Sequence, residues 1–247
     1  MHSLARRIPL IIALVATSPA IAADMAARPY TKAPPKPVYD WSGFYLGVNG
    51  GWGSAQSCWD LVGTLVLQIP PVSEGCHSGS GGVVGGQIGY NFQMGSFVFG
   101  LDAQWDWARL TGSNIPAPFP LTFNRTTVNS VGLIDLRAGY AWNNVLAYIK
   151  GGAAAAQNHF DFGLNVDGVP LAATSSTRWG GNIGAGLEYG FAPQWSVAVE
   201  YNHLFLGRRN ESFGPNLLSN TGVVESIRQD ADMVTARLNY RFGGSRY

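Results

Sequence analysis

Charged side chains are scarce in this sequence. Lys, Arg, Asp and Glu make up 13% of the 247 residues, whereas about 25% is usual for soluble domains. Glycine (32 residues) and aromatic residues (12%) are abundant instead. A surface with so few charges must be buried or must contact something other than water.

Long hydrophobic runs are also lacking. The mean hydropathy is only +0.04, and no stretch after the N-terminus has the ~18 consecutive apolar residues of a transmembrane helix. Helical membrane spans are therefore excluded. Few charges, abundant glycine and aromatic residues, and no long apolar run together favour a membrane β-barrel.

The first residues have the three parts of a secretory signal peptide. Arg6 and Arg7 form a basic region, residues 8–16 are apolar, and residues 20–22 (Ala-Ile-Ala) form a small-x-small cleavage site. We expect residues 1–22 to be removed, because the apolar part is too short for a membrane anchor. Loss of the two arginines lowers the formal charge from +1 to −1 (1 − 2). No nucleic-acid partner is expected at this charge balance.

Only two cysteines are present, Cys58 and Cys76. Export places them in an oxidising compartment, where a pair commonly forms a disulfide. The bridge would close a loop worth ~3 kcal/mol in the chain-entropy model. A metal or redox site is the weaker alternative, because the spacing is not that of a CxxC motif and no acidic cluster adjoins it.

The residues after the signal peptide change character at about residue 40. Residues 23–40 hold four prolines together with alanine and lysine, which predicts an extended periplasmic linker. From residue 41 to 242, apolar and polar residues alternate in eight segments of about the length that crosses a bilayer as a tilted strand. These segments are 43–52, 82–92, 97–107, 130–142, 145–157, 178–191, 195–201 and 234–242.

The connections between these segments alternate in length. Short connections near 93–96, 142–144 and 192–194 alternate with long ones near 54–80, 110–128, 158–177 and 207–229. Outer-membrane barrels have short periplasmic turns and long extracellular loops. Both termini are therefore expected in the periplasm, and the two cysteines are expected in the first long loop.

The cost of burying charge in lipid decides which face points inward. A charged side chain on the lipid face costs ~2–4 kcal/mol near mid-bilayer, so the charged face of each segment must line the lumen. We interpret the inward charged side chains as a network of ion pairs that compensate one another. A narrow ion path is the alternative, and acid–base catalysis is the least favoured use. The inward charges are Asp102, Asp106, Asp135, Arg137, Lys150, Glu188, Glu200, Arg237 and Arg241.

Seven of the eight tryptophans fall near the ends of the segments, as interfacial belts require. Trp41, Trp142 and Trp195 are expected in the inner belt, and Trp52, Trp105, Trp107 and Trp179 in the outer belt. A soluble sandwich or lipocalin-like barrel is disfavoured, because it would need apolar residues inside and charges outside.

Three motifs resemble a known family. Residues 39–53 (YDWSGFYLGVNGGWG), 148–152 (YIKGG) and 238–242 (LNYRF) are similar to segments of the small outer-membrane barrels of alphaproteobacteria, the RopB-like or "porin family" proteins with an OmpA-type eight-stranded barrel. The resemblance covers residues 35–242. It implies an abundant surface protein that supports the envelope and interacts with a host, and some members resemble haem binders or pores.

The same resemblance implies partners. These are outer-membrane lipids and lipopolysaccharide, the barrel-assembly machinery, and a host surface ligand or haem. Such barrels typically end on an aromatic residue that the assembly machinery reads, but here residues 243–247 follow Phe242. Either Phe242 or the terminal Tyr247 must therefore serve as the signal.

Histidines and glycine-rich runs give no specific sign of chemistry. His77, His159 and His203 lie in or beside the long connections, where we expect solvated side chains; axial ligation of haem is the alternative. A barrel deacylase would need a His-x-Ser pair, but Leu204 and Phe205 follow His203. The glycines of 180–190 recur at strand spacing and do not form a phosphate loop.

The sequence therefore predicts an all-β protein, an eight-stranded antiparallel up-and-down transmembrane β-barrel. The barrel spans 41–242, after a signal peptide (1–22) and a linker (23–40) and before a periplasmic tail (243–247). We predict a non-enzymatic outer-membrane protein without a cofactor, with a structural role in the envelope and contact with a host or the environment through its long loops. A narrow porin-like channel and a haem-binding receptor are the alternatives.

Overall fold

The computed structural model describes residues 39–64, 66–165, 168–215 and 222–242. The expected signal peptide, residues 23–38 of the linker, and the tail with Tyr247 lie outside these residues. Within them, no helix is long and apolar enough to cross a bilayer. The strands are β1 (Gly43–Thr64), β2 (Gln68–Met94), β3 (Phe97–Asn114), β4 (Thr122–Trp142), β5 (Val145–Leu164), β6 (Pro170–Ala192), β7 (Trp195–Phe213) and β8 (Val223–Phe242).

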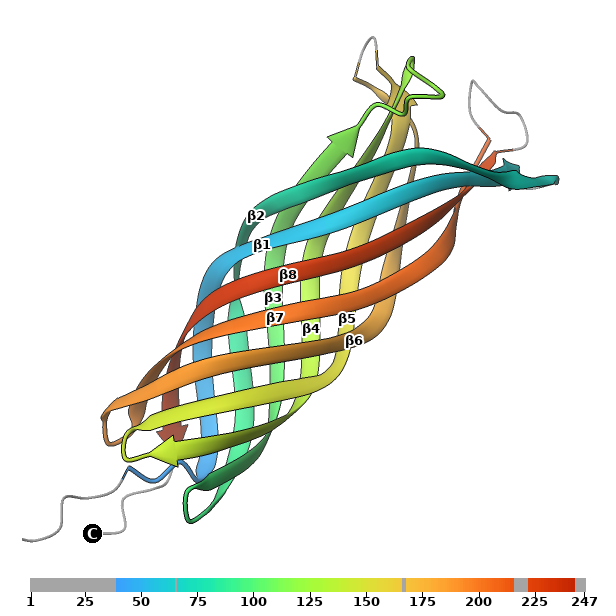
Figure 1. Ribbon diagram of the computed structural model, residues 1–247. Helices are drawn as coiled ribbons and strands as arrows, with labels where there is room; N and C mark the ends of the chain where they lie inside the picture. The colour runs from blue at the N-terminus through green and yellow to red at the C-terminus, as the bar shows by residue number, and fades with distance from the viewer. Residues whose placement is uncertain (1–38, 65, 166–167, 216–221, 243–247) are drawn as a thin grey trace, which may run out of the picture. The chain divides into compact units, whose positions relative to one another are not determined.

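The eight strands close into one barrel in sequence order (Figure 1). Each strand pairs antiparallel with the next, and β8 pairs with β1. Following the register partners once around the barrel from Phe44 leads to Ser54, a stagger of ten residues (54 − 44). The predicted fold class is therefore confirmed. A barrel of eight strands has an interior just wide enough for side chains to fill.

Three two-residue turns lie at one end of the barrel. They are Gly95–Ser96, Asn143–Asn144 and Pro193–Gln194, where the short connections were predicted. Gly95 (φ 61°) and Asn143 (φ 53°) adopt the positive φ that tight hairpins require. The start of β1 and the end of β8 lie at this same end (Figure 1).

The half of the barrel next to these turns is apolar outside and polar inside. Phe44, Leu46 and Val48 on β1 are 59%, 52% and 61% exposed. Outward aliphatic and aromatic residues continue in the same way around all eight strands, whereas the intervening residues are buried and mostly polar. Because so large an apolar exterior would aggregate in water, this part of the barrel is the membrane-spanning part.

Six of the seven tryptophans assigned to belts face outward near the edges of this band. Trp142 and Trp195 lie on the side of the turns, and Trp52, Trp105, Trp107 and Trp179 lie on the opposite side. Trp41 does not belong to a belt, because it is 0% exposed inside the barrel. Residues of β1 with even numbers face the lipid, and those with odd numbers, such as Tyr45, face inward. Trp41 has an odd number and therefore lies on the inward side.

The strands continue well beyond the outer tryptophans, which corrects the prediction of long loops. β1 runs twelve residues past Trp52 (64 − 52), about 40 Å of extended chain at 3.3 Å per residue. Only residues 65–67, 115–121, 165–169 and 214–222 connect the strands at this end. Most of each predicted loop is therefore paired strand. We call this part of the barrel, beyond the outer tryptophans, the extension.

The extension was missed because its outward residues are mostly polar. Above the belt, the inward residues are a mixture of apolar side chains and buried polar ones such as Glu74 and Asn124. Buried Trp59, Phe160, Phe162, Phe213 and Ile227 form an apolar cluster inside it. A search for strands with apolar outer faces does not recognise this pattern.

The disulfide between Cys58 and Cys76 lies within the extension. The two residues are direct register partners on β1 and β2. The bridge therefore joins two paired strands, where the sequence predicted a bridge within a loop.

Replacing both cysteines by serine should leave the membrane-spanning barrel intact. We expect Cys58→Ser/Cys76→Ser to keep the compact band of unheated gels, because lipid-facing contacts do not change. The upper parts of β1 and β2 should exchange their amide hydrogens faster, since a bridge of this loop length is worth ~3 kcal/mol. Wild-type protein treated with reductant is the matched control. Loss of the compact band in the variant would contradict this assignment.

Candidate functional site

The interior of the membrane-spanning part holds a connected layer of charged side chains. The structure brings eight of the nine predicted residues into ion pairs, which come from β3, β4, β5, β6, β7 and β8. Alternate residues of each strand face inward. The register between neighbouring strands then brings the charged ones to similar depths. The charged layer therefore forms only when the barrel closes and brings these strands together.

Lys150 and Arg237 form the centre of the layer. The Lys150 ammonium lies 3.3 Å from Asp102, 3.0 Å from Asp135 and 2.8 Å from Glu200. Arg237 donates to both oxygens of Asp102, at 3.1 and 3.0 Å, and also to Glu200. Each carboxylate except Asp135 is therefore shared by two cations, which compensates the cost of removing it from water.

Arg137 connects this centre to the turn end of the barrel. Its guanidinium donates to Glu188 and stacks over the Tyr148 ring, 3.5 Å from the ring centroid. Glu188 also lies 3.8 Å from Arg241 and accepts a hydrogen bond from Ser196 at 2.6 Å. The ion pairs thus continue nearly to the end of β8.

Asp106 is the one predicted residue without an ion pair in the described part of the chain. Its carboxylate accepts a hydrogen bond from Gln104 at 2.6 Å. The sequence argument also missed the neutral partners of the layer. Tyr45 donates to Asp102 at 2.8 Å, and Tyr148 donates to Glu200 at 2.7 Å. Both tyrosines occupy inward positions in the apolar–polar alternation of their own strands. This position was the signal that could have identified them.

An apolar layer lies above the charges, toward the extracellular end. Leu133 on β4, Leu204 and Leu206 on β7, and Met233 on β8 are at most 3% exposed and face one another inside the barrel. On every one of these strands the apolar residues lie farther from the turns than the ion pairs.

A second apolar group closes the end at the turns. Trp41 packs with Val98 and Leu146, and the Arg241 guanidinium lies 4.8 Å from its ring. The Trp41 backbone N–H donates to the Gln93 side chain at 2.7 Å. Tyr39, at the end of the expected linker, packs against the Trp41 ring at 4.5 Å. The charged layer is thus enclosed between two apolar groups.

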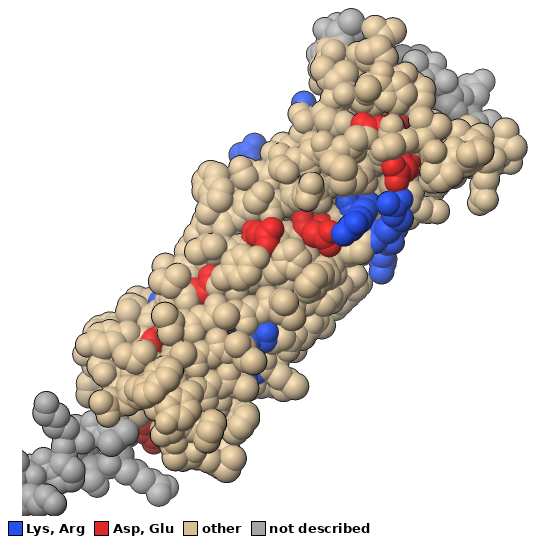
Figure 2. Space-filling model, in the orientation of Figure 1, with Lys and Arg blue, Asp and Glu red and all other residues tan. Residues whose placement is uncertain are grey.

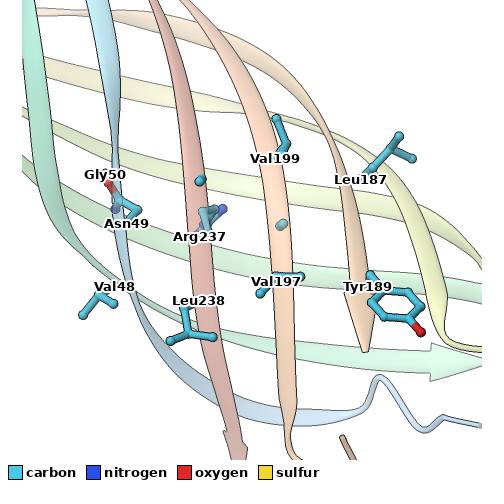
Figure 3. Close-up of a pocket in the computed structure, with 11 residues that line it drawn as sticks. Val48, Asn49, Gly50, Leu187, Tyr189, Val197, Val199, Arg237 and Leu238 are labelled. Atoms are coloured by element: carbon cyan, nitrogen blue, oxygen red, sulfur yellow. The ribbon is translucent and has the colours of Figure 1, made fainter. Parts of the chain in front are cut away.

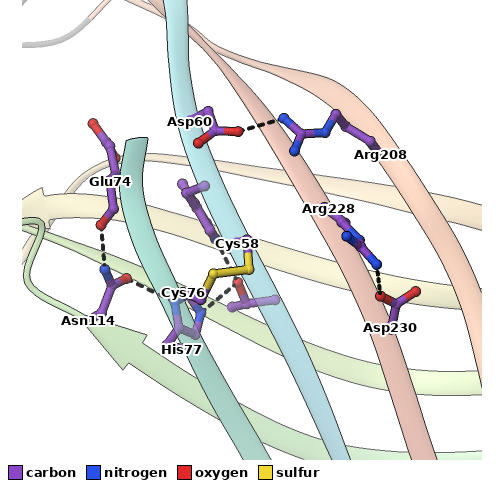
Figure 4. Close-up of a disulfide and its surroundings, with 11 residues drawn as sticks. Cys58, Asp60, Glu74, Cys76, His77, Asn114, Arg208, Arg228 and Asp230 are labelled. Carbon is purple, nitrogen blue, oxygen red and sulfur yellow. Dashed lines mark hydrogen bonds and ion pairs between the residues drawn. A yellow bond between two sulfur atoms is a disulfide. The ribbon is translucent and has the colours of Figure 1, made fainter. Parts of the chain in front are cut away.

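His77 lies inside the extension, which contradicts the prediction of a solvated loop histidine. Its Nδ1 contacts Asn114 at 2.9 Å and its Nε2 contacts Thr126 at 3.1 Å (Figure 4). Burial lowers the pKa of His77. The side chain is buried because β2 continues as paired strand and turns this residue inward.

The other two histidines lie on different strands. His159 on β5 contacts Ser175 at 2.8 Å and Asp161 at 3.1 Å. His203 on β7 contacts Asp232 at 2.7 Å. No group of three or more His, Cys, Asp or Glu side chains that could hold a metal occurs among the residues that the structure describes. With both ring nitrogens of His77 and His159 engaged, axial ligation of haem would have to displace existing contacts.

Two buried glutamates lie above the belt, inside the extension. Glu74 on β2 accepts a hydrogen bond from Asn124 at 2.5 Å. Glu225 on β8 is 1% exposed, and burial together with the nearby Glu74 and Asp60 raises its pKa to about 9. Its register partner on β7 is a third acid, Glu211, which pairs with Arg178 at 3.3 Å. Glu225 is therefore protonated at neutral pH.

The outer wall has shallow grooves. Figure 3 shows one, across β1, β6, β7 and β8, with Val48, Leu187 and Leu238 at its surface. Asn49 and Arg237 also line it, but their side chains are buried on the inner side. In the membrane such a groove faces lipid tails, and its outward lining is aliphatic apart from Tyr189.

The chain is similar to outer-membrane proteins in sequence and in fold. Residues 11–242 match the model of the outer membrane protein β-barrel domain. The 31 kDa outer-membrane immunogenic protein of Brucella melitensis is 31% identical over 207 residues, which cover 81% of this chain and 86% of that protein. The 25 kDa outer-membrane immunogenic protein of Brucella abortus is 27% identical, over 89% of this chain and 94% of that protein.

A solved structure with a similar fold is the outer membrane protease OmpT from Escherichia coli. The TM-score is 0.51 with 10% sequence identity, over 81% of this chain and 97% of that chain. At this identity the likeness concerns the fold alone.

Breaking the charged layer should lower the heat resistance of the barrel in detergent. We expect Glu188→Ala, Arg137→Ala and Lys150→Ala to lose the compact gel band at lower temperature, because an uncompensated buried charge costs about 3–5 kcal/mol. Asp106→Asn is the matched control, since the hydrogen-bond partners of Asp106, Gln104 and Asn49, are neutral. Variants that keep wild-type heat resistance would show that these charges are hydrated.

Glu225 should make the extension less stable as pH rises. The pKa of about 9 in the folded state lies above the unfolded value of about 4.3. The folded protein therefore holds the proton more tightly, and stability falls between about pH 4.3 and pH 9. We expect Glu225→Gln to slow amide exchange in the upper part of β8 at pH 8 and to remove this pH dependence. A wild-type protection that is constant over this range, after correction for intrinsic exchange, would contradict the assignment.

Proposed function

The chain belongs to the outer membrane protein β-barrel family, and we propose that it is a closed, non-enzymatic surface barrel. In this proposal the membrane-spanning part reinforces the outer membrane, and the extension presents a folded surface to a host or the environment. The observation that carries the proposal is the enclosure of the ion pairs between two apolar groups.

The apolar layer inside the barrel is the argument against a transport pore. Hydrated ions would lose water at Leu133, Leu204 and Met233, because aliphatic side chains cannot replace the lost solvation. Below this layer, cations and carboxylates already satisfy one another. The narrow channel is therefore the weaker alternative.

The extension supports the surface role. It carries paired strands about twelve residues beyond the belt, with a disulfide between the first two strands. Relatives of this chain are named outer-membrane immunogenic proteins, which fits a protein that exposes a rigid surface outside the cell. A haem-binding receptor is less favoured, since the contacts of His77 and His159 engage both of their ring nitrogens.

Assembly into the membrane requires a signal at the end of β8. Phe242 is the last residue of β8, faces outward and is 54% exposed. We expect the barrel-assembly machinery to read Phe242, because its side chain continues the lipid-facing row of this strand.

Conductance across a planar bilayer tests the closed barrel directly. We expect the refolded mature chain to give no steady current. Leu133→Ser/Leu204→Ser should produce a current, because the substitutions place hydroxyls in the apolar layer. Ile134→Ala, on the lipid face beside Leu133, is the control and should stay silent. A steady wild-type current would replace this proposal with the pore.

A further inference from the structure

Two neighbouring strands separate in the extension. The pairing of β6 with β7 ends at Gly181 and Phe205. Above this point β6 stays paired with β5, and β7 stays paired with β8, up to their extracellular ends. Within the described part of the chain, no backbone pairing joins residues 170–180 to residues 206–213. We call the opening between these two stretches the seam; the two strands diverge there in Figure 1.

A β-bulge in β7 accounts for the seam. The register of β7 with β8 shifts between Phe205 and Gly207, and Gly207 has a positive φ of 68°. A bulge bends the strand that carries it, so β7 turns away from β6. Gly180 still approaches β7 closely, since a Cβ there would overlap the Phe205 carbonyl oxygen. Complete pairing is required in hydrocarbon, and the belt residue Trp179 places the start of the seam at its outer edge.

The seam leaves backbone groups of β6 without a neighbouring strand. Gly190 donates its N–H to Asn144 on the β5 side, and the register of β6 with β5 has no shift from there to residue 172. Even-numbered residues of β6 therefore direct their N–H and C=O to β5, because these groups alternate in direction along a strand. The odd-numbered residues direct theirs into the seam. The exposed ones among them are Ala173, Ser175 and Thr177.

The open edges of the extension differ in how they are protected. The pairing of β2 with β3 also ends, at Ser80, but Pro70 and Pro71 remove two N–H donors from the upper part of β2. The edge of β7 carries the bulge and two arginines. Residues 171–177 of β6 (LAATSST) contain neither proline nor charge. This stretch therefore keeps an edge that can pair with another strand.

Charged side chains lie on the inner side of the seam. Arg178 on β6 is 0% exposed and donates to the Ile227 carbonyl at 2.9 Å and to Glu211 at 3.3 Å. Its Nε has no hydrogen-bond partner among the described residues. Arg209 on β7 is exposed and occupies an inward position, since its register partner is the buried Ile227. Glu225 is neutral here, because burial raises its pKa to about 9. Two guanidinium groups therefore face one carboxylate, which leaves an excess of positive charge.

The outer side of the extension has no such excess. Its ion pairs are Arg208 with Asp60 (2.5 Å), Arg228 with Asp230 (3.3 Å), and His159 with Asp161 (3.1 Å). Arg208 and Arg228 are register partners, so their two acids also offset the repulsion between them. Figure 2 shows basic and acidic side chains next to one another on the outer surface. Charge in the seam therefore selects a partner through the side chains that face inward.

We propose that residues 171–177 of β6 bind an extended peptide by strand addition, with an acidic side chain of the peptide directed toward Arg178 and Arg209. Main-chain hydrogen bonds give such a complex its affinity, and the alternate side chains give it specificity. The proposal rests on the proposed exposure of the extension outside the cell, and it names the kind of partner that this surface takes.

Binding exchanges one carboxylate for another. Ser176 now bridges the seam through a 2.8 Å hydrogen bond to Glu211. A strand between β6 and β7 needs about 9.6 Å between them, twice the spacing of paired strands, so the peptide displaces Glu211 from Ser176. The peptide carboxylate then replaces Glu211 at Arg178, whose buried charge keeps a partner.

Binding of a synthetic peptide to the refolded mature chain in detergent micelles tests the charge preference. The probe is a fluorescent peptide of alternating threonine and glutamate with blocked ends, and a threonine–glutamine peptide is its neutral counterpart. We expect the glutamate peptide to bind at least roughly tenfold more tightly, given the strength of charge-assisted hydrogen bonds. Arg209→Gln should reduce this preference, and Arg109→Gln, an exposed arginine on β3, should keep it. Equal binding of the two peptides, or equal losses in the two variants, would overturn the proposal.

Backbone chemistry separates strand addition from simple attraction of charge. Ala173→Pro removes an N–H that faces the seam, leaves the pairing with β5 and should abolish binding. Ala173→Val keeps the N–H and is the matched control, and the compact band of unheated gels checks that both variants fold. A glutamate peptide methylated on every backbone nitrogen keeps its charge but should not bind. Retained binding by the proline variant or by the methylated peptide contradicts strand addition.

Amide exchange locates the bound peptide. We expect the glutamate peptide to slow exchange in residues 171–177 and to leave the open edge of β2, residues 68–79, unchanged. Protection of the β2 edge alone would place the peptide elsewhere and reject the assignment.

A second copy of the chain is the other occupant that the seam could take. We expect the wild type to be monomeric in micelles without peptide. A wild-type dimer that Ala173→Pro converts to a monomer would show that the seam joins copies, and the proposal would be wrong. A monomer that carries no steady current and binds no peptide would also overturn it, while leaving the closed barrel intact.

Discussion

Closure of the strand ladder is the constraint on which the rest of the structure depends. A backbone N–H or C=O without a partner is too costly in hydrocarbon, so the strands must pair all the way round. Eight strands with a stagger of ten residues close this ladder and leave an interior that side chains fill. Charged groups on the inner wall then have little water, and this is why Lys150 and Arg237 each contact more than one carboxylate.

Two opposite patterns follow one another along the same strands. Below Trp52, lipid surrounds the barrel and polar side chains are inside. Above it, water surrounds the barrel, and Trp59 and Phe160 are inside instead. Within the sheets β7–β8–β1–β2 and β3–β4–β5–β6 the hydrogen-bonded ladder continues across this boundary, because backbone pairing is indifferent to which face is apolar. Within each sheet the membrane boundary is therefore a change in side chains and not in backbone structure.

The interior charges lie between two apolar groups. Lys150 and Arg237 both contact the carboxylates of Asp102 and Glu200, so each cation has protein partners in place of water. Leu133 on one side of this layer and Trp41 on the other are buried as well. This arrangement is the basis of the proposed closed barrel.

The sequence alone determined the barrel and the direction of its faces. Alternation gave the membrane-spanning strands, the cost of charge in lipid gave the inner face, and six tryptophans marked the belts. Tertiary structure decided what depends on register: the partners of each ion pair, the opposition of Arg208 and Arg228, and the burial of His77. It also decided the length of the strands, because the extension lacks the apolar outer face that marks a membrane strand. Tyr45 and Asp102, for example, are in contact although they lie 57 residues apart in the sequence. A sequence pattern specifies which face a residue occupies, but not which residue it meets across a closed barrel.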